Sequence, residues 1–265
     1  MEGSKIISFF STIKPDPVIK GHYFIGGCGH SGTTLIANIL ATHSQLYVPL
    51  RETRLFRTQK FKRRLRYNRL AQEVKSSGKS ILMEKTPSHI RNIDEIRAIF
   101  PNVKMVVPVR DGRDVAASYF KRYNDKYRGI KAWIHLNEFA ATNMNAGDFL
   151  VYRHEDLVEE LEGTLRKICD FLEIPFEPDL LNYHTKSQKW HGHKKIKHTD
   201  KRTGRGHDKR RNWQVNQPIF NSSGSWKKYM SPDDLTELRT GRGLELMQLF
   251  GYAQEPAESN YQATS

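Results

Sequence analysis

The chain has 265 residues, of which 43 are Lys or Arg and 29 are Asp or Glu, so its formal net charge is +14. Hydrophobic residues make up 37% of the sequence, and this composition excludes collagen-like, coiled-coil and wholly disordered chains. The length suits one α/β domain with a substantial buried core. No apolar run approaches the roughly 20 residues of a membrane-spanning helix, and residues 1–17 contain no pattern typical of a secretory signal.

The positive charge is concentrated in two segments. Residues 51–79 contain 11 Lys or Arg and two acids, and residues 186–211 have the same balance, so each segment has a net charge of +9. Such patches attract anions through their long-range field, and the sequence therefore predicts an anionic ligand or partner. Two alternatives stay open. In the first, residues 51–79 are a solvated helix face and residues 186–211 are a flexible loop. In the second, the chain binds nucleic acid, and Trp190 and Trp213 could stack on bases.

Apolar periodicity and turn residues predict strands that alternate with helices along the chain. The expected strands are 22–27, 80–85, 103–109 and 148–153, and the expected helices are 33–42, 54–77, 86–100, 112–123, 131–146 and 155–172. A last helix is expected to begin at Ser231, because serine is a good helix cap and Asp234 follows three residues later. This alternation predicts the α/β class, as a P-loop-like three-layer α/β/α domain with a central parallel sheet.

Residues 1–253 are expected to form a single domain, followed by a disordered tail over 254–265. The basic segment at about 184–215 has no periodicity and is too long for an ordinary connection, so it is expected to be a lid-like or flexible insertion. The two cysteines, Cys28 and Cys169, fall in segments with the pattern of core elements, which favours free thiols in a reducing compartment.

The turn after the first strand contains a phosphate-binding pattern. Residues 27–34 read GCGHSGTT, which fits the P-loop template except that Thr33 stands where that template has lysine. Glycines let successive backbone N–H groups face one anion, and the following helix adds a favourable dipole. The missing lysine argues against hydrolysis of ATP or GTP. The alternative is a purely structural glycine turn. Because ligands bind beyond the carboxyl ends of parallel strands, the turns at 85–88 and 110–114 are expected to lie nearby.

A second motif follows the strand 103–109, where Arg110 begins the sequence RDGRD and Ser118 lies eight residues later. An arginine fork and a hydroxyl at such a turn can hold a phosphate dianion, although an arginine there is often only a salt-bridge partner. Together the two motifs resemble those of sulfotransferases that use 3′-phosphoadenosine 5′-phosphosulfate (PAPS). The resemblance implies that Arg110 and Ser118 bind the 3′-phosphate. It also implies that the 5′-phosphosulfate is bound by Gly29, His30, Ser31, Gly32, Thr33 and Thr34.

Within that family the sequence is most similar to the tyrosylprotein sulfotransferase branch. The shared segments are GGC-x-x-SGTTL, RETR at 51–54, FPN-x-K at 100–104, RDGR, and FLEIP at 171–175. The similarity implies that Glu52 is the general base and that Lys85, at the end of the second strand, is the active-site lysine. Glu52 lies between Arg51 and Arg54 in the sequence and would accept a proton from a well-placed hydroxyl. The alternative for Glu52 is a surface acid in a salt bridge, and the alternative for Lys85 is a surface lysine that flanks a helix.

The sequence departs from the family pattern at two places. The residue before SGTT, usually Arg or Lys in the family, is His30 here, so its charge would depend on pH. The family also has a serine shortly before a tryptophan in its C-terminal part. In this chain residues 221–226 contain three serines, of which Ser222 and Ser225 are the candidates for contacting the donor. Trp226 would either pack beside the adenine or fill the core.

The resemblance implies in-line transfer of the sulfuryl group from PAPS to an acceptor hydroxyl, with PAP as the product. Glu52 would take the proton, while Lys85 and His30 would neutralise the developing charge. No metal is expected, because the histidines at 184, 191, 193, 198 and 207 lack carboxylate or cysteine partners at ligand spacing. The acceptor is expected to be a small natural product, a glycan or a peptide tyrosine, and a negatively charged acceptor would suit the basic segments.

Two other functions stay open on the sequence alone. One is a P-loop-like kinase or other phosphotransferase, against which Thr33 counts. The other is a basic nucleic-acid-binding protein, whose affinity would fall steeply with salt, although no nucleic-acid partner is expected. The lack of a membrane segment predicts a cytoplasmic protein, or one of the secretory lumen if the sequence is part of a longer chain. The sequence predicts no oligomeric state.

Overall fold

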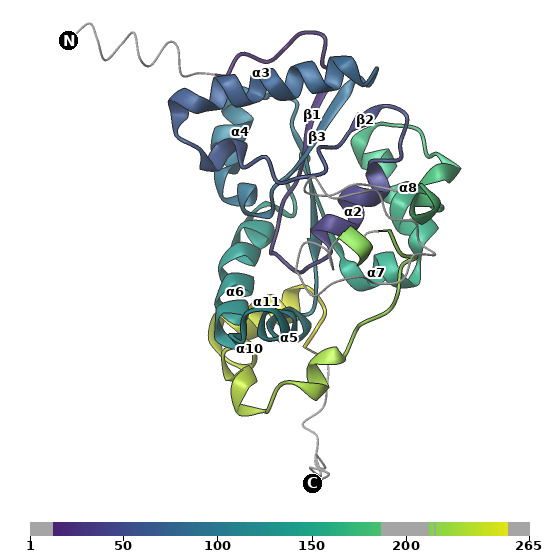
Figure 1. Ribbon diagram of the computed structural model, residues 1–265. Helices are drawn as coiled ribbons and strands as arrows, with labels where there is room; N and C mark the ends of the chain where they lie inside the picture. Colours follow the sequence, from purple (N-terminus) through teal and green to yellow (C-terminus); the bar gives the residue numbers. More distant parts are fainter. Residues whose placement is uncertain (1–12, 187–211, 215, 254–265) are drawn as a thin grey trace, which may run out of the picture.

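The computed structural model describes residues 13–186, 212–214 and 216–253, and its centre is a five-stranded parallel sheet (Figure 1). The strands lie in the order β2-β3-β1-β4-β5. Their bounds are Leu46–Tyr47 for β2, Ile81–Lys85 for β3, Gly21–Ile25 for β1, Lys104–Val109 for β4 and Phe149–Arg153 for β5. Because β1 lies between β3 and β4, the turns that follow these three strands adjoin at the carboxyl edge of the sheet.

Helices connect the strands and continue to the C-terminal side of the described chain. The α-helices are α2 (Thr33–Leu40), α3 (Lys60–Ser76), α4 (Ile93–Ile99), α5 (Gly112–Tyr123), α6 (Lys126–Asn143), α7 (His154–Glu159), α8 (Leu161–Leu172), α10 (Thr236–Arg239) and α11 (Gly241–Leu249). Short 3-10 turns are η1 (Leu55–Arg57), η2 (Pro87–Asn92), η3 (Pro178–Leu180), η4 (Tyr183–Thr185), η5 (Ser225–Lys228) and η6 (Asp233–Leu235).

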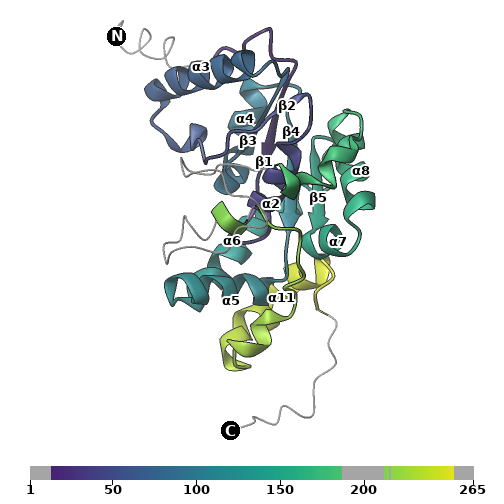
Figure 2. The same ribbon diagram turned by 45° about the vertical axis from the view of Figure 1, so that its right-hand side comes forward.

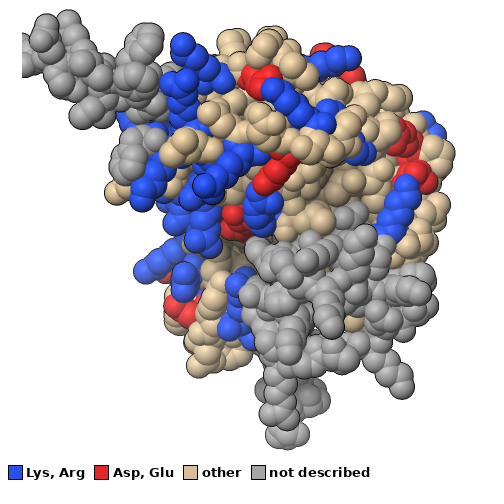
Figure 3. Space-filling model, turned by 45° about the horizontal axis from the view of Figure 1, so that its top comes forward, with Lys and Arg blue, Asp and Glu red and all other residues tan. Residues whose placement is uncertain are grey.

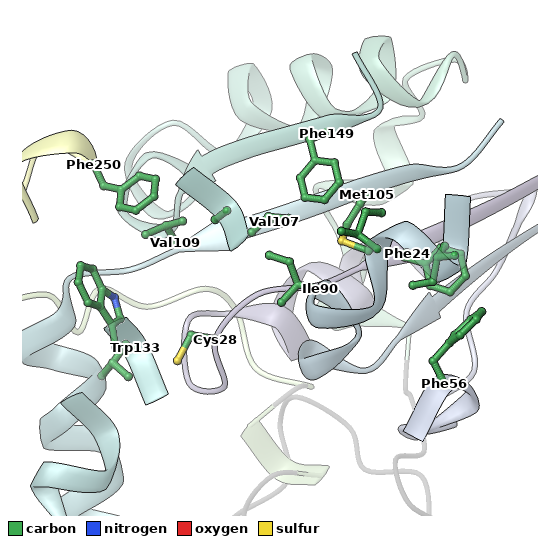
Figure 4. Packing of buried hydrophobic residues seen from close by; sticks show 14 of the residues in the cluster. Phe24, Cys28, Phe56, Ile90, Met105, Val107, Val109, Trp133, Phe149 and Phe250 are labelled. Atoms are coloured by element: carbon green, nitrogen blue, oxygen red, sulfur yellow. The ribbon is translucent and has the colours of Figure 1, made fainter. Parts of the chain in front are cut away.

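Alternating side chains of the strands build two cores, one on each face of the sheet. Phe24, Leu82 and Met105 pack on one face with residues of α3, α4 and α6, as Figure 4 shows for part of this cluster. Ile25 and Met83, their neighbours in the strands, pack on the other face with residues of α2, α7 and α8. Figure 2 shows helices on both sides of the strands. The predicted three-layer α/β/α fold is confirmed.

The structure confirms the four predicted strands to within two residues and adds the edge strand β2, which was not predicted. The predicted helix 54–77 was wrong at its start, because α3 begins at Lys60 after the separate turn η1. The predicted helix 86–100 begins instead with the 3-10 turn η2. The helix expected at 131–146 starts earlier, at Lys126, where the Asp125 carboxylate accepts a hydrogen bond from the Arg128 N–H and caps it. The helix expected at 155–172 is two helices, because the backbone at Glu160 is not helical (φ −128°).

The predicted cap at Ser231 is present as a reciprocal pair. The Ser231 N–H donates to the Asp234 carboxylate at 2.9 Å, and the Asp234 N–H donates to the Ser231 hydroxyl at 3.4 Å. The expected single helix is instead three short pieces: the 3-10 turn η6 runs directly into α10, and the extended backbone at Thr240 separates α10 from α11.

Both cysteines are free and buried, as predicted, and burial raises the pKa of the Cys28 thiol to about 12. Within the described residues, no helix is both long enough and apolar enough to span a membrane. The predicted lid-like insertion falls mainly on residues 187–211 and the predicted tail on 254–265, and both lie outside the described residues, as does Trp190.

Candidate functional site

The turn after β1 is the candidate phosphate-binding loop, called the phosphate loop below. Three of its residues have positive φ: Gly27 at +113°, His30 at +69° and Gly32 at +90°. Gly32 is the N-cap of α2 and contributes no side chain to the helix end. A Cβ atom at Gly32 would lie 2.5 Å from Nδ1 of His154, so this position requires glycine both for its conformation and for space. The N-terminus of α2 therefore faces this turn with its N–H groups available to an anion.

Buried polar atoms around the loop fit an anionic ligand. The Ser31 hydroxyl is buried beside the weakly polar Cys28 thiol and makes no hydrogen bond of ordinary geometry to the described residues. Nε of Arg110 is also buried without a hydrogen-bond partner in this part of the chain. Buried donors of this kind are costly unless a ligand or water pairs with them. The residues present therefore fit the phosphate groups of a bound nucleotide.

The turn after β3 brings the predicted base and lysine together. Lys85 is paired in register with Ile25, the last residue of β1, and only 2% of its side chain is exposed. Its Nζ lies 3.3 Å from Oε1 of Glu52, whose side chain is 33% exposed. The Gly27 N–H donates to the Pro87 carbonyl oxygen at 3.0 Å, which ties this turn to the phosphate loop. Glu52, Lys85 and the loop thus share one edge of the sheet.

The arginine that precedes Glu52 is engaged elsewhere. The Arg51 guanidinium donates two hydrogen bonds to Glu73 of α3, at 2.5 and 2.8 Å. The cation that contacts the Glu52 carboxylate is Lys85, from a different strand end. Sequence neighbours alone did not identify this partner, because the pairing depends on the fold.

The turn after β4 joins the phosphate loop through His30. Nη1 of Arg110 donates to the His30 carbonyl oxygen at 3.4 Å, and the side-chain nitrogen Nδ1 of His30 lies 2.7 Å from the Ser118 hydroxyl. The His30 ring packs on Tyr119, with ring centroids 4.5 Å apart. Arg110 and Ser118, eight residues apart in the sequence, therefore both contact His30. The roles assigned to these three residues by resemblance stay predictions.

Asp114 holds the serine-rich segment against this turn, a contact that the sequence did not reveal. Its buried carboxylate accepts hydrogen bonds from the Gly224 N–H, the Ser225 hydroxyl and the Trp226 N–H, at 2.8 to 2.9 Å. The segment is thereby placed so that Nη2 of Arg110 donates to the Ser222 hydroxyl at 3.1 Å. Of the two candidate serines, Ser222 contacts Arg110 and Ser225 is bonded to Asp114.

Trp226 is 5% exposed and packs in the core, with the Arg113 guanidinium 4.6 Å from its ring centroid. This placement agrees with the alternative in which the tryptophan fills the core. The backbone oxygen of Arg110 is in turn fixed by a 2.7 Å hydrogen bond from the Trp133 indole. The Arg110 turn is therefore held from both sides.

His154 is a further buried residue at this edge that the sequence analysis did not single out. Burial, with the nearby Arg110 charge adding to it, lowers the pKa of His154 to about 3, so the imidazole is neutral at physiological pH. Its Nδ1 has no hydrogen-bond partner within the described ranges. The sequence could have indicated His154 by its position directly after β5, because the carboxyl ends of the parallel strands meet at one edge of the sheet.

A second group that was missed surrounds Glu84, a fully buried acid in β3. Its carboxylate bonds to Thr53, Thr86 and His89. The signal in the sequence was an acid inside the apolar strand ILMEK, because a buried carboxylate needs hydrogen-bond partners.

Basic side chains gather on the outer face near α3. Figure 3 shows Lys and Arg side chains concentrated on one side of this view. The exposed members on α3 and on the segment before it are Arg51, Arg54, Arg57, Lys60, Lys62, Arg69 and Lys75. The basic character predicted for residues 51–79 is thus a surface property next to the segment that carries Glu52.

In the part of the chain that the structure describes, no group of three or more His, Cys, Asp or Glu residues could hold a metal ion. The histidines at 191, 193, 198 and 207 lie outside that part.

Comparisons with known proteins find sulfotransferases that are similar to this chain. A family model described as the sulfotransferase family matches residues 62–178. Protein-tyrosine sulfotransferase A of Caenorhabditis elegans is 26% identical over 197 residues, covering 60% of this chain and 52% of that protein. The chain spans about half the length of the first curated relatives that it matches.

Two solved structures share the fold at low sequence identity. The sulfotransferase domain from the curacin biosynthetic pathway has a TM-score of 0.63 and 18% identity, covering 89% of this chain and 99% of that one. A mouse sulfotransferase complexed with PAP has a TM-score of 0.56 and 12% identity, covering 96% of this chain and 95% of that one. In its sequence matches the chain is similar to the sulfotransferase family and to its tyrosylprotein branch, and it shares its fold with solved sulfotransferases.

Proposed function

We propose that the chain is a PAPS-dependent sulfotransferase, which transfers a sulfuryl group to an acceptor hydroxyl. The observation that carries the proposal is the meeting of three features at one edge of the sheet: the phosphate loop, the Glu52–Lys85 pair and the Arg110 turn. PAPS supplies the sulfuryl group and leaves as PAP. The mouse structure that shares this fold is complexed with PAP, which supports the choice of donor.

The two ends of the donor would be bound by different segments. The N–H groups of residues 31–34 and the α2 N-terminus would bind the 5′-phosphosulfate, because they present donors and a favourable dipole. Arg110, Ser118 and Ser222 would bind the 3′-phosphate, since the Arg110 guanidinium contacts both the Ser222 hydroxyl and the His30 carbonyl oxygen, and the Ser118 hydroxyl lies beside the His30 ring. Thr33, in place of the P-loop lysine, argues against a nucleoside triphosphate in the same loop.

Glu52 and Lys85 would act on the two sides of the transferred group. A Glu52 carboxylate oxygen takes the proton of the acceptor hydroxyl as the new oxygen–sulfur bond forms. Lys85 and the loop N–H groups stabilise the negative charge that builds as the sulfur–oxygen bond to the phosphate breaks. A partly exposed base beside a buried lysine suits this division, because the acceptor must reach the former and the latter must face a dry site.

The acceptor we propose is a hydroxyl compound that carries negative charge. Arg51, Arg54 and Arg57 are exposed on the segment that contains Glu52, and α3 adds further cations (Figure 3). Such a surface would attract an anionic acceptor toward the base. A peptide tyrosine, a glycan and a small hydroxylated natural product are the acceptor classes to compare.

The test is transfer of labelled sulfate from PAPS to a panel of those three acceptor classes, together with calorimetry of PAP and ATP. We expect label in at least one class and binding of PAP that is much tighter than that of ATP. Phosphate transfer from ATP with no use of PAPS would instead support the phosphotransferase. Salt-sensitive nucleic-acid binding without any PAP binding would support the nucleic-acid-binding protein.

A further inference from the structure

Glu84 is a buried charge next to the proposed catalytic lysine but on the opposite face of the strand. It is paired in register with Phe24, and its side chain is fully buried. Because side chains alternate along a strand, Glu84 lies on the α3 face while Lys85 lies on the other. A buried carboxylate is costly unless it is hydrogen-bonded, so its partners indicate what it organises.

Three side chains donate to the Glu84 carboxylate. The hydroxyls of Thr53 and Thr86 lie 2.6 and 2.7 Å from Oε1, and Nδ1 of His89 lies 2.8 Å from Oε2. Nε2 of His89 accepts the Phe56 N–H at 3.2 Å, which places the proton of a neutral imidazole on Nδ1. Burial raises the pKa of Glu84, but His89 and the two hydroxyls outweigh it, and the net pKa is lowered.

These partners sit beside the two proposed catalytic residues in the sequence. Thr53 follows Glu52 directly, and Glu84 and Thr86 stand on either side of Lys85. A further hydrogen bond crosses between the same segments, from the Arg54 N–H to the Thr86 hydroxyl at 3.1 Å. The network therefore joins two segments about 30 residues apart at the positions adjacent to Glu52 and Lys85.

The direct ion pair between Glu52 and Lys85 contributes little to fixing the distance between the two side chains. Its length is 3.3 Å, and a third of the Glu52 side chain is exposed. Partly exposed ion pairs contribute little, because solvent screens them and their side chains lose freedom. The buried hydrogen bonds of Glu84 are shielded from water and can hold the backbone of both segments in place.

Resting on the function proposed above, we propose that Glu84, Thr53, Thr86 and His89 form a positioning network that sets the separation of Glu52 and Lys85. These four residues do not touch the reacting atoms. They act through the backbone on either side of the base and the lysine, and a misplacement of about 1 Å in such a pair can lower turnover by about 100-fold.

Thr53→Val tests the network, because valine keeps the shape of threonine and removes the hydroxyl that bonds to Glu84. Thr164→Val is the matched control: Thr164 is 6% exposed, against 7% for Thr53, and its hydroxyl donates to a backbone oxygen within the α7–α8 region. We expect Thr53→Val to lower kcat at least about tenfold with PAP affinity unchanged, and Thr53→Ser to restore kcat. Thr164→Val should leave kcat unchanged at temperatures well below its melting point.

A second readout does not require turnover. In crystal structures we expect the Glu52–Lys85 contact to open in Thr53→Val and to persist in Thr164→Val and Thr53→Ser. If the wild-type chain transfers no sulfate, the proposed function is wrong. The Glu52–Lys85 distance in the variant structures would still show whether the network positions these two residues. Wild-type kcat and an unchanged contact in Thr53→Val would overturn the positioning network and leave the proposed function standing.

Discussion

The Lys85 ammonium lies 3.3 Å from the Glu52 carboxylate, although the two residues come from different segments and Lys85 is buried at the end of β3. The pair lies beside the phosphate loop, because β3 is the neighbour of β1 and Pro87 accepts a hydrogen bond from the loop. A carboxylate and a lysine held beside such a loop can divide the work of one group transfer. The carboxylate can take a proton, and the lysine can stabilise the developing negative charge.

Glu52→Gln should lower kcat by about 100-fold or more, because the amide cannot take the acceptor proton. PAP affinity should stay within about threefold of wild type, since the residues proposed to bind the donor lie on other segments. Steady-state kinetics and calorimetry measure the two effects. Glu95→Gln is the matched control, because the Glu95 side chain has nearly the same exposed fraction (34% against 33%) and is paired with Arg63. Equal activity in both variants would remove Glu52 from the mechanism.

Arg110→Lys should weaken PAP binding by about 10- to 100-fold, because a lysine cannot reproduce the planar fork that reaches both His30 and Ser222. Calorimetry gives the affinity, and the melting temperature shows that the variant folds. Arg166→Lys, on the surface of α8, should bind PAP as wild type does. Unchanged affinity in Arg110→Lys would place the 3′-phosphate elsewhere.

Gly32→Ala should destabilise the fold by about 2 kcal/mol or more, since alanine is strained at a φ of +90° and its Cβ meets His154 at 2.5 Å. It should also abolish PAP binding, because the loop must move to accommodate the methyl group. Gly163→Ala provides the contrast: a Cβ there meets no atom within 4 Å, and a gain of about 0.5 kcal/mol is expected in helix α8. Chemical denaturation measures both, and similar losses in the two variants would contradict the assigned strain.

Stability should fall as the pH drops below about 6.5, partly because of His22. Burial lowers the pKa of His22 to about 4, with Asp16 opposing the shift. The unfolded chain therefore takes up a proton near pH 6.5 that the folded chain accepts only near pH 4. The contribution of His22 is fully present above pH 6.5 and is lost as the pH falls toward 4, by up to about 1.4 kcal/mol per pH unit. His22→Gln should show a shallower decrease in unfolding free energy over this range. The same slope in both proteins would show that His22 does not titrate in this way.

Local sequence patterns predicted the parts of the fold and site that depend on local chemistry. The glycine-rich turn at 27–34 and the apolar run at 103–109 mark where a strand ends and a loop begins. The sequence therefore placed the three candidate turns correctly at one edge of the sheet. The edge strand β2 was missed because two residues carry no usable periodicity.

Contacts between distant segments could not be predicted in the same way. Glu84 and Thr53 are 31 residues apart, and Asp114 and Trp226 are 112 apart. Their pairing depends on how the sheet and helices pack. The 3-10 turn at the start of the predicted helix 86–100 also involves contacts with distant segments. His89 in this turn is hydrogen-bonded both to Glu84 and to the Phe56 N–H.

A crystal structure of the chain with PAP would show directly where the two phosphates bind. We expect the 5′-phosphate at the N–H groups of residues 31–34 and the 3′-phosphate at Arg110 and Ser118, with Lys85 and Glu52 facing the position of the missing sulfuryl group. Density for PAP at any other place on the molecule, or only one phosphate at this edge of the sheet, would contradict this expectation.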